Sequence, residues 1–204
     1  MANTKKTNDA TNGGEIEVTG QAVNNLQADS VTVRYGSAGD IKAEKVMISL
    51  GAARLAEAET VELRQAVAQV VQGDTITIRQ GGAAQVQAES LSMTQGGLVF
   101  AETKEANLTA SNVGAILASG DVVLDQTITR AVITRGDVKM DQSGSGVMLA
   151  RKIETGDNSG TILMIAGRVS GNINSVFGPA SSAAFGAAFA LVIGLLFWIR
   201  RRLS

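Results

Sequence analysis

The chain contains no cysteine and no histidine among its 204 residues. Disulfides, thiolate catalysis and imidazole acid–base chemistry are therefore excluded, together with nearly all zinc and haem sites. Aromatic residues make up only 3% of the chain, and proline occurs once. The apolar content of 45% is enough for a core, but that core must be thin and filled by Ala, Val, Ile and Leu. This composition disfavours an ordinary globular enzyme.

Strong net charge is also missing. The formal charge is −1 at pH 7, which gives no overall attraction to nucleic acid. A chain without cysteine is compatible with reducing and oxidising compartments alike. We expect no cofactor, no nucleic-acid partner and no small-molecule substrate.

Apolar pairs with one residue between them recur along the chain at a fixed step. Seven pairs follow one another every 15 residues, from Ile16/Val18 to Ala106/Leu108. Four more follow at steps of 16, 16, 15 and 16, ending at Val169/Gly171. The core residues predicted from the strongest pairs are Val31, Val33, Val46, Ile48, Val61, Leu63, Ile76, Ile78, Leu91 and Met93. Eleven registers of one unit indicate a repeat architecture.

Each unit divides into three segments of five residues, such as GAARL, AEAET and VELRQ at 51–65. The first and third residues of each five are apolar or small, which describes a very short strand followed by a bend. Three such segments make one triangular coil. The longer coils are expected to take their extra residue on one edge, within 116–121, 132–137 and 163–168. Recurring glycines at Gly36, Gly51, Gly81 and Gly96 indicate a bend that needs positive φ or close backbone approach.

The predicted fold is all-β: a triangular single-stranded β-solenoid of about ten to eleven coils, followed by one transmembrane α-helix. At about 4.8 Å per coil, the rod would be about 50 Å long. The expected organisation is a flexible polar tail at 1–14, the solenoid at 15–175, a linker at 176–182, a transmembrane helix at 183–199 and a basic tail at 200–204.

The segment GDIKAEKVMI at 39–48 resembles the coil pattern of bactofilins, which are bacterial polymer-forming cytoskeletal proteins. LQADSVTV at 26–33 and VQAESLSM at 86–93 carry the same phrase, and the resemblance covers about residues 15–173. It implies a triangular β-helix that polymerises end to end without nucleotide, in filaments that often lie on membranes. The chain departs from that family in its larger number of coils and its C-terminal anchor.

The anchor is predicted from Ala183 to Ile199, which is apolar throughout and would span about 25 Å as a helix. Trp198, Arg200, Arg201 and Arg202 fit a membrane interface followed by a charged stop. Small residues recur every four positions at Ser182, Gly186, Ala190 and Gly194, a pattern that lets helices approach closely in lipid. Self-association through this seam and a simple abundance of Ala and Gly are both open interpretations.

The sequence gives contradictory indications of how the chain is oriented in the membrane. The arginines favour a cytoplasmic C-terminus and therefore an external solenoid. The polar N-terminus has no signal-peptide pattern, which argues against export and favours a cytoplasmic solenoid. We expect the cytoplasmic arrangement, with a cell-surface location as the alternative.

One turn position reads Asp29, Glu44, Glu59, Asp74 and Glu89, so five acids are expected to stack one coil apart. Two such charges about 4.8 Å apart repel by roughly 0.9 kcal/mol even in water. A solvated charged edge is the simplest interpretation, and a cation ladder or a lateral filament contact are alternatives. Arg34, Arg64 and Arg79 form a second expected ladder, with Asp125 and Asp141 farther along it.

These observations favour a non-enzymatic structural or scaffold protein that assembles with itself while the helix fixes it to a bilayer. The alternative is an exported cell-surface adhesin or binding module held by the same anchor. An enzyme of the hexapeptide-transferase type is disfavoured, because those enzymes commonly use a histidine and this chain has none.

Overall fold

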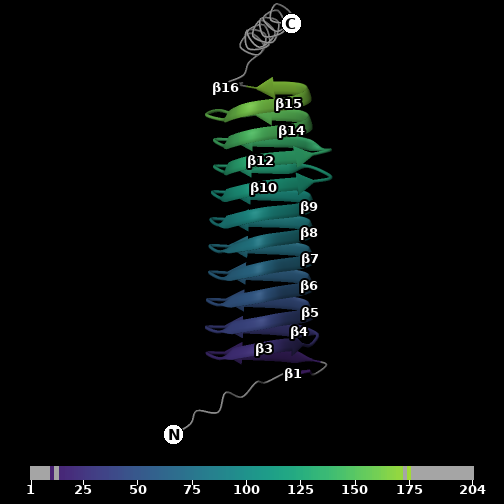
Figure 1. Ribbon diagram of the computed structural model, residues 1–204, viewed down its shortest axis with the longest axis vertical. Helices are drawn as coiled ribbons and strands as arrows, with labels where there is room; N and C mark the ends of the chain where they lie inside the picture. The colour runs from purple at the N-terminus through teal and green to yellow at the C-terminus, as the bar shows by residue number, and fades with distance from the viewer. Residues whose placement is uncertain (1–9, 12–13, 172–173, 176–204) are drawn as a thin grey trace, which may run out of the picture.

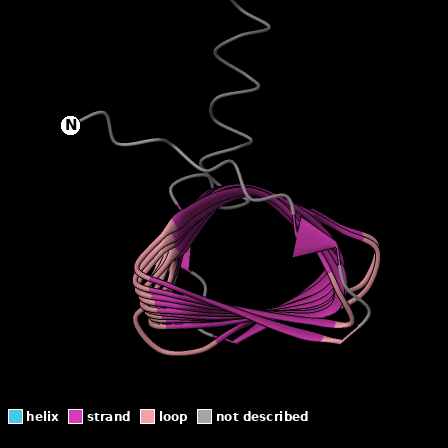
Figure 2. Ribbon diagram, turned by 90° about the horizontal axis from the view of Figure 1, so that it is seen from below, coloured by secondary structure: helices cyan, strands magenta, loops and turns pink. Residues whose placement is uncertain are grey.

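The computed structural model describes residues 10–11, 14–171 and 174–175. They form a parallel β-solenoid of about ten turns, which rises as one continuous stack (Figure 1). The sixteen strands belong to one sheet. Seen along the rod, each coil has three sides joined by turns around one interior (Figure 2). The predicted all-β solenoid is therefore confirmed.

Long strands run through most of each central coil. The five central strands are β5 (Ser37–Ser49), β6 (Ala52–Arg64), β7 (Val67–Arg79), β8 (Gly82–Thr94) and β9 (Gly97–Thr109). The N-terminal strands are β1 (Ala10–Thr11), β2 (Glu15–Thr19), β3 (Ala22–Gln27) and β4 (Ser30–Arg34). The C-terminal strands are β10 (Asn112–Ala118), β11 (Val122–Asp125), β12 (Ile128–Thr134), β13 (Asp137–Asp141), β14 (Gly144–Thr155), β15 (Gly160–Gly171) and β16 (Asn174–Ser175).

The spacing of buried residues explains the three sides of a coil. In β6, the buried residues are Ala53, Ala56, Ala58, Val61 and Leu63. A spacing of two keeps successive side chains on the same face of one straight side, as in any strand. A spacing of three crosses a corner, where two consecutive residues point outward. The grid of five seen in the sequence is thus the length of one side.

Neighbouring coils pair at a constant step of 15 residues over the N-terminal part of the rod. Val31 pairs with Val46, Val46 with Val61, and Val61 with Ile76. Equal steps place like positions above one another, so inward residues form columns. All ten residues expected in the main core columns are at most 1% exposed. The column of small residues beside them packs against this core, with Ala58 at 8% exposure.

One corner of every coil uses a residue in the left-handed region. These residues, with φ between 46° and 56°, are Tyr35, Leu50, Gln65, Gln80, Gln95, Ala110, Gln126, Gln142 and Asn158. The glycines predicted at this bend follow directly after the left-handed residue and do not have positive φ themselves. A Cβ atom added at Gly51 would lie 2.5 Å from the carbonyl oxygen of Gly36. Close backbone approach, not positive φ, is therefore the reason for glycine there.

The one-residue insertions occur at two corners, which corrects the prediction of a single edge. Ala118 keeps the 15-residue step from Thr103, whereas Val122 lies 16 residues after its partner Ala106. That insertion falls within 119–121, as predicted, and the next falls within 135–137. The third was expected within 163–168, but this segment pairs evenly with 147–152. It falls instead within 156–159, where Gly, Asp, Asn and Ser favour a turn.

Hydroxyl side chains replace glycine and alanine at one inward corner position of the C-terminal coils. Each hydroxyl in this column donates to the carbonyl oxygen two residues earlier, at 2.6–3.4 Å: Ser111, Thr127, Ser143 and Ser159. The hydroxyl oxygens of the last two also accept bonds from the backbone N–H of Thr127 and Ser143 in the preceding coil. Because these buried hydroxyls are bonded, the interior tolerates them.

At the two ends of the chain, the structure describes part of the predicted N-terminal tail and none of the predicted C-terminal anchor. Within the tail predicted to be flexible, Ala10 and Thr11 form β1 and pair with Leu26 and Gln27. The solenoid therefore gains a short strand before residue 15. The predicted linker at 176–182, helix at 183–199 and basic tail at 200–204 lie outside the described residues.

Candidate functional site

One side of the triangle carries the acidic residues and a column of exposed aliphatic residues, and we call it the acidic–apolar face. It consists of the outward second and fourth residues of the side that Ala56–Thr60 form in one coil, with their equivalents in the other coils. The second residues form one continuous column: Lys42, Glu57, Gln72, Gln87, Glu102, Leu117, Ile133, Leu149 and Ile165. The character of this column changes from polar to aliphatic along the rod.

The five predicted acids occupy the other column of this face. Asp29, Glu44, Glu59, Asp74 and Glu89 are all exposed. The backbone N–H of Glu44 donates to the carbonyl oxygen of Asp29 at 3.0 Å, which fixes the one-coil step between them. Among the residues that the structure describes, no group of three or more acidic side chains is placed to hold a metal ion. A solvated charged edge is the interpretation that this geometry favours.

The acidic column is balanced only in part by neighbouring cations. Lys42 Nζ lies 2.8 Å from Glu57 Oε2, and this hydrogen bond raises the pKa of Lys42, with a smaller contribution from the charge of Glu57. A shallow groove of about 440 Å³ runs beside the pair and reaches Asp74 and Ala88. Both side chains are about half exposed, so the pair contributes little to stability.

The acidic run ends at Glu89, and the same column continues with Lys104, Ser119, Arg135 and Arg151. A second groove of about 490 Å³ lies at this change of sign, and its lining includes Glu89, Lys104, Leu117 and Arg135. The acidic–apolar face is therefore hollowed over much of its length. Its polar and aliphatic halves meet near Leu117.

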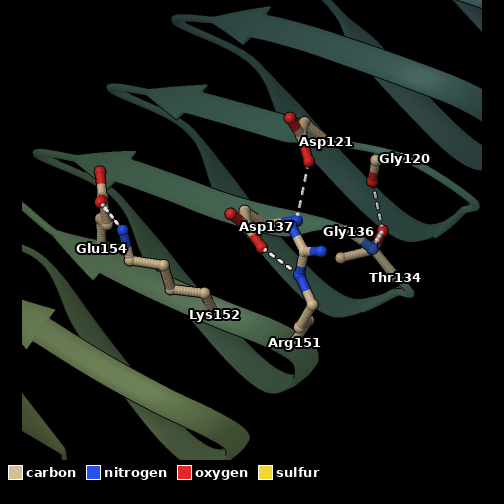
Figure 3. A network of polar contacts seen from close by, with 8 residues as sticks. All are labelled: Gly120, Asp121, Thr134, Gly136, Asp137, Arg151, Lys152 and Glu154. Atoms are coloured by element: carbon tan, nitrogen blue, oxygen red, sulfur yellow. Dashed lines mark hydrogen bonds and ion pairs between the residues drawn. The ribbon is translucent and has the colours of Figure 1, made fainter.

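The insertion corner beside the aliphatic half contains a compact ionic cluster (Figure 3). Arg151 Nε donates to Asp137 Oδ1 at 2.9 Å, and the backbone N–H of Asp137 donates to Asp121 Oδ1 at 2.8 Å. The hydrogen bond from Arg151 lowers the pKa of Asp137, and the same bond raises the pKa of Arg151. Lys152 pairs with Glu154 within the same strand, β14. The two inserted aspartates are thus bound within the chain.

The predicted arginine ladder lies on a different side of the coil. Arg64 and Arg79 are direct partners, whereas Ser49 separates Arg34 from Arg64. Arg64 Nε donates to Glu62 Oε1 at 2.7 Å within its own strand. The column continues through Thr94 and Thr109 to the predicted acids Asp125 and Asp141.

A glutamine ladder stands beside these arginines, and the sequence reasoning missed it. The side-chain amide of Gln65 donates to Gln80 Oε1, and that of Gln80 donates to Gln95 Oε1, both at 3.2 Å. The left-handed corner brings the three amides into line. Three glutamines exactly one coil apart were the signal that could have revealed the ladder.

The residues predicted to act at a membrane lie outside the described residues: Ser182, Gly186, Ala190, Gly194, Trp198, Arg200, Arg201 and Arg202. In the described part of the chain, no helix is long and apolar enough to cross a bilayer. Comparison with protein-family models, curated proteins and solved structures finds no match to this chain.

Proposed function

We propose that this chain is a non-enzymatic, membrane-anchored scaffold protein that assembles with itself through its solenoid. The observation that carries the proposal is the continuous sheet, in which neighbouring coils of the described residues always pair in parallel. A ladder of this kind can be extended by another copy as readily as by another coil. The resemblance to bactofilins supports the same function.

The two ends of the rod present strand edges that fit this role. Within the described residues, β2 pairs only with β4, and β15 pairs beyond β14 only through Gly160 and Thr161. Open parallel edges bind further strands by backbone hydrogen bonds. The side chains inside the first coil, Ile16 and Val18, are apolar like those of the coils that follow.

The chemistry of the described residues supports a structural role over a catalytic one. Among the described residues, the shifted pKa values of Lys42, Asp137 and Arg151 all arise in surface ion pairs. Active sites typically contain ionisable groups whose pKa is shifted by burial. The interior instead holds aliphatic side chains and hydroxyls bonded to the backbone.

Negative-stain microscopy of the full chain in detergent tests the proposal. We expect filaments or other assemblies longer than one rod of about 50 Å. Ile16→Lys places a charge inside the first coil and should leave short rods, because an inward charge at an edge opposes stacking. Glu17→Lys changes the neighbouring outward residue and should leave assembly intact. Single rods of the unmodified chain at every concentration would refute self-assembly.

The anchor and its orientation are part of the proposal and need a separate test. Flotation of the full chain with vesicles should be lost when residues 183–199 are deleted, because their apolar side chains would hold the protein in lipid. Protease treatment of intact cells then distinguishes the two orientations. A cytoplasmic solenoid is protected, whereas the alternative cell-surface module is cut.

A further inference from the structure

The aliphatic half of the acidic–apolar face exposes four large side chains in one column. Leu117, Ile133, Leu149 and Ile165 are 41%, 43%, 41% and 53% exposed and pair in succession, one coil apart. Val147 and Leu163 extend this surface at the adjoining corner, each 41% exposed. We call these six residues the aliphatic column.

The fold does not require aliphatic side chains there. In the N-terminal coils the same outward position holds Lys42, Glu57, Gln72 and Gln87. Of the thirteen exposed large apolar residues in the described part of the chain, nine lie from Leu117 to Ile165. A contiguous exposed apolar patch on a folded chain marks an interaction surface.

We propose that the aliphatic column binds the aliphatic column of a second copy, with the two rods parallel and level. The inference rests on the proposed self-assembly and names its lateral surface. The side chains of the column are spaced one coil apart. They fit, over the whole length of the column, only a surface whose side chains have the same spacing. A second copy supplies that repeat without any further requirement.

The charge distribution places this contact at the C-terminal half. Residues 14–111 contain seven Lys and Arg against twelve Asp and Glu, a net charge of −5. Residues 112–171 contain six of each, a net charge of 0. Two copies therefore repel one another along their N-terminal halves and meet without net repulsion along their C-terminal halves.

The arginines beside the column favour parallel rods. If the columns of antiparallel rods were related by a two-fold axis, the edge with Arg135 and Arg151 would lie against the same edge of the second copy. In a parallel pair this edge lies against the corner with Ala131 and Val147, which carries one arginine, Arg130, so fewer like charges meet. If the proposed anchors hold both rods upright on one bilayer, they impose the same direction.

Charge alone suggests a competing antiparallel arrangement. Full antiparallel overlap would place Glu59 near Arg135 of the second copy and Glu44 near Arg151. It would also set Leu149 against Lys42, leaving the aliphatic column without an apolar partner. Exposed ion pairs contribute little, so burial of the aliphatic column decides for the parallel pair.

Cysteine cross-linking tests the contact cleanly because the chain has no cysteine of its own. The full chain would carry Leu117→Cys or Leu149→Cys, be reconstituted in vesicles and be treated with a short bis-maleimide cross-linker. Each variant should form a cross-linked dimer, since level columns bring identical positions together at about the 10 Å that separates packed sheets, a span that a bis-maleimide bridges and a disulfide does not. Lys139→Cys, an exposed residue of β13 on another side of the coil, is the control and should remain monomeric.

Three results would overturn the proposal. The first is filament formation by Leu149→Cys protein without a cross-linked dimer. The second is a cross-link between Glu59→Cys and Arg135→Cys chains, which would show the antiparallel pair. The third is a Leu149→Cys chain that forms no dimer but whose cysteine is protected from maleimide when vesicles are present. This would show that lipid covers the column.

A double substitution, Ile133→Gln with Leu149→Gln, separates lateral pairing from end-to-end assembly. Gln72 and Gln87 occupy the same column, so the coil accommodates glutamine, and circular dichroism should be unchanged. We expect paired rods to become single-width filaments in electron micrographs. Paired rods in the double variant would overturn the lateral contact alone. The absence of any assembly in the unmodified chain would overturn the proposed function itself.

Discussion

Ile76 is the most informative position for testing how the solenoid core stabilises the chain. It is fully buried in β7 between Val61 and Leu91, its partners in the adjoining coils. Ile76→Ala removes apolar contacts and leaves a cavity, which together destabilise a core by about 2–5 kcal/mol. Backbone ladders on both sides fix the two neighbours one coil away. The site cannot collapse, so we expect the upper part of that range.

Hydrogen exchange of backbone amides is the suitable assay, because a repeat array need not unfold in one step. Ile76→Ala should lower the opening free energy of β7 and of its neighbours β6 and β8. Thr77→Ala, at the next outward position, should change it by about 0.5 kcal/mol or less. Val18→Ala in the first coil should also have a small effect, because end coils open independently.

The reasoning would be refuted by equal effects at Ile76 and Thr77. It would also be refuted if Val18→Ala destabilised the central coils as strongly as Ile76→Ala does. The first result would mean that the core columns do not stabilise the fold. The second would mean that the coils are not coupled mainly to their neighbours.

Three further predictions concern the corners. Ala110→Gly should raise stability by about 0.5–1 kcal/mol in urea unfolding, because it removes a side chain from a left-handed residue. Thr127→Val should lower stability by about 0.5–1.5 kcal/mol in the same assay, since the carbonyl oxygens of Leu108 and Asp125 lose the hydrogen bond from the Thr127 hydroxyl. The pKa of Asp137, measured by NMR, should lie below the ordinary carboxyl range and rise in Arg151→Ala. Its depressed pKa means that the ion pair stabilises the fold above the pKa of the unfolded carboxyl and loses this effect as pH falls through the folded pKa.

The repeat was readable from the sequence because a narrow prism leaves few choices at each inward position. Val46, Ile48 and their counterparts had to be apolar, and the constant step between them directly gave the coil. Periodicity of this kind depends only on local geometry. It therefore predicted the fold class and the inward columns.

Other features depended on contacts that periodicity does not encode. The third insertion was misplaced because the apolar spacing is the same whether the extra residue falls at 156–159 or at 163–168. The left-handed corner residues were not predictable, because Gln65, Gln80 and Gln95 occupy positions of positive φ where a glycine would have indicated that conformation. The aliphatic column was not predicted, because its six members are exposed and the repeat pattern identifies only the inward positions.

Fibre diffraction from oriented assemblies of the full chain tests the central claim, self-assembly of the solenoid, most directly. If coils of one copy pair with coils of the next, the reflection at about 4.8 Å should be sharp, with a coherence length beyond one rod of about 50 Å. A reflection whose width corresponds to a single rod would contradict end-to-end pairing. The Ile16→Lys chain should give that broader reflection.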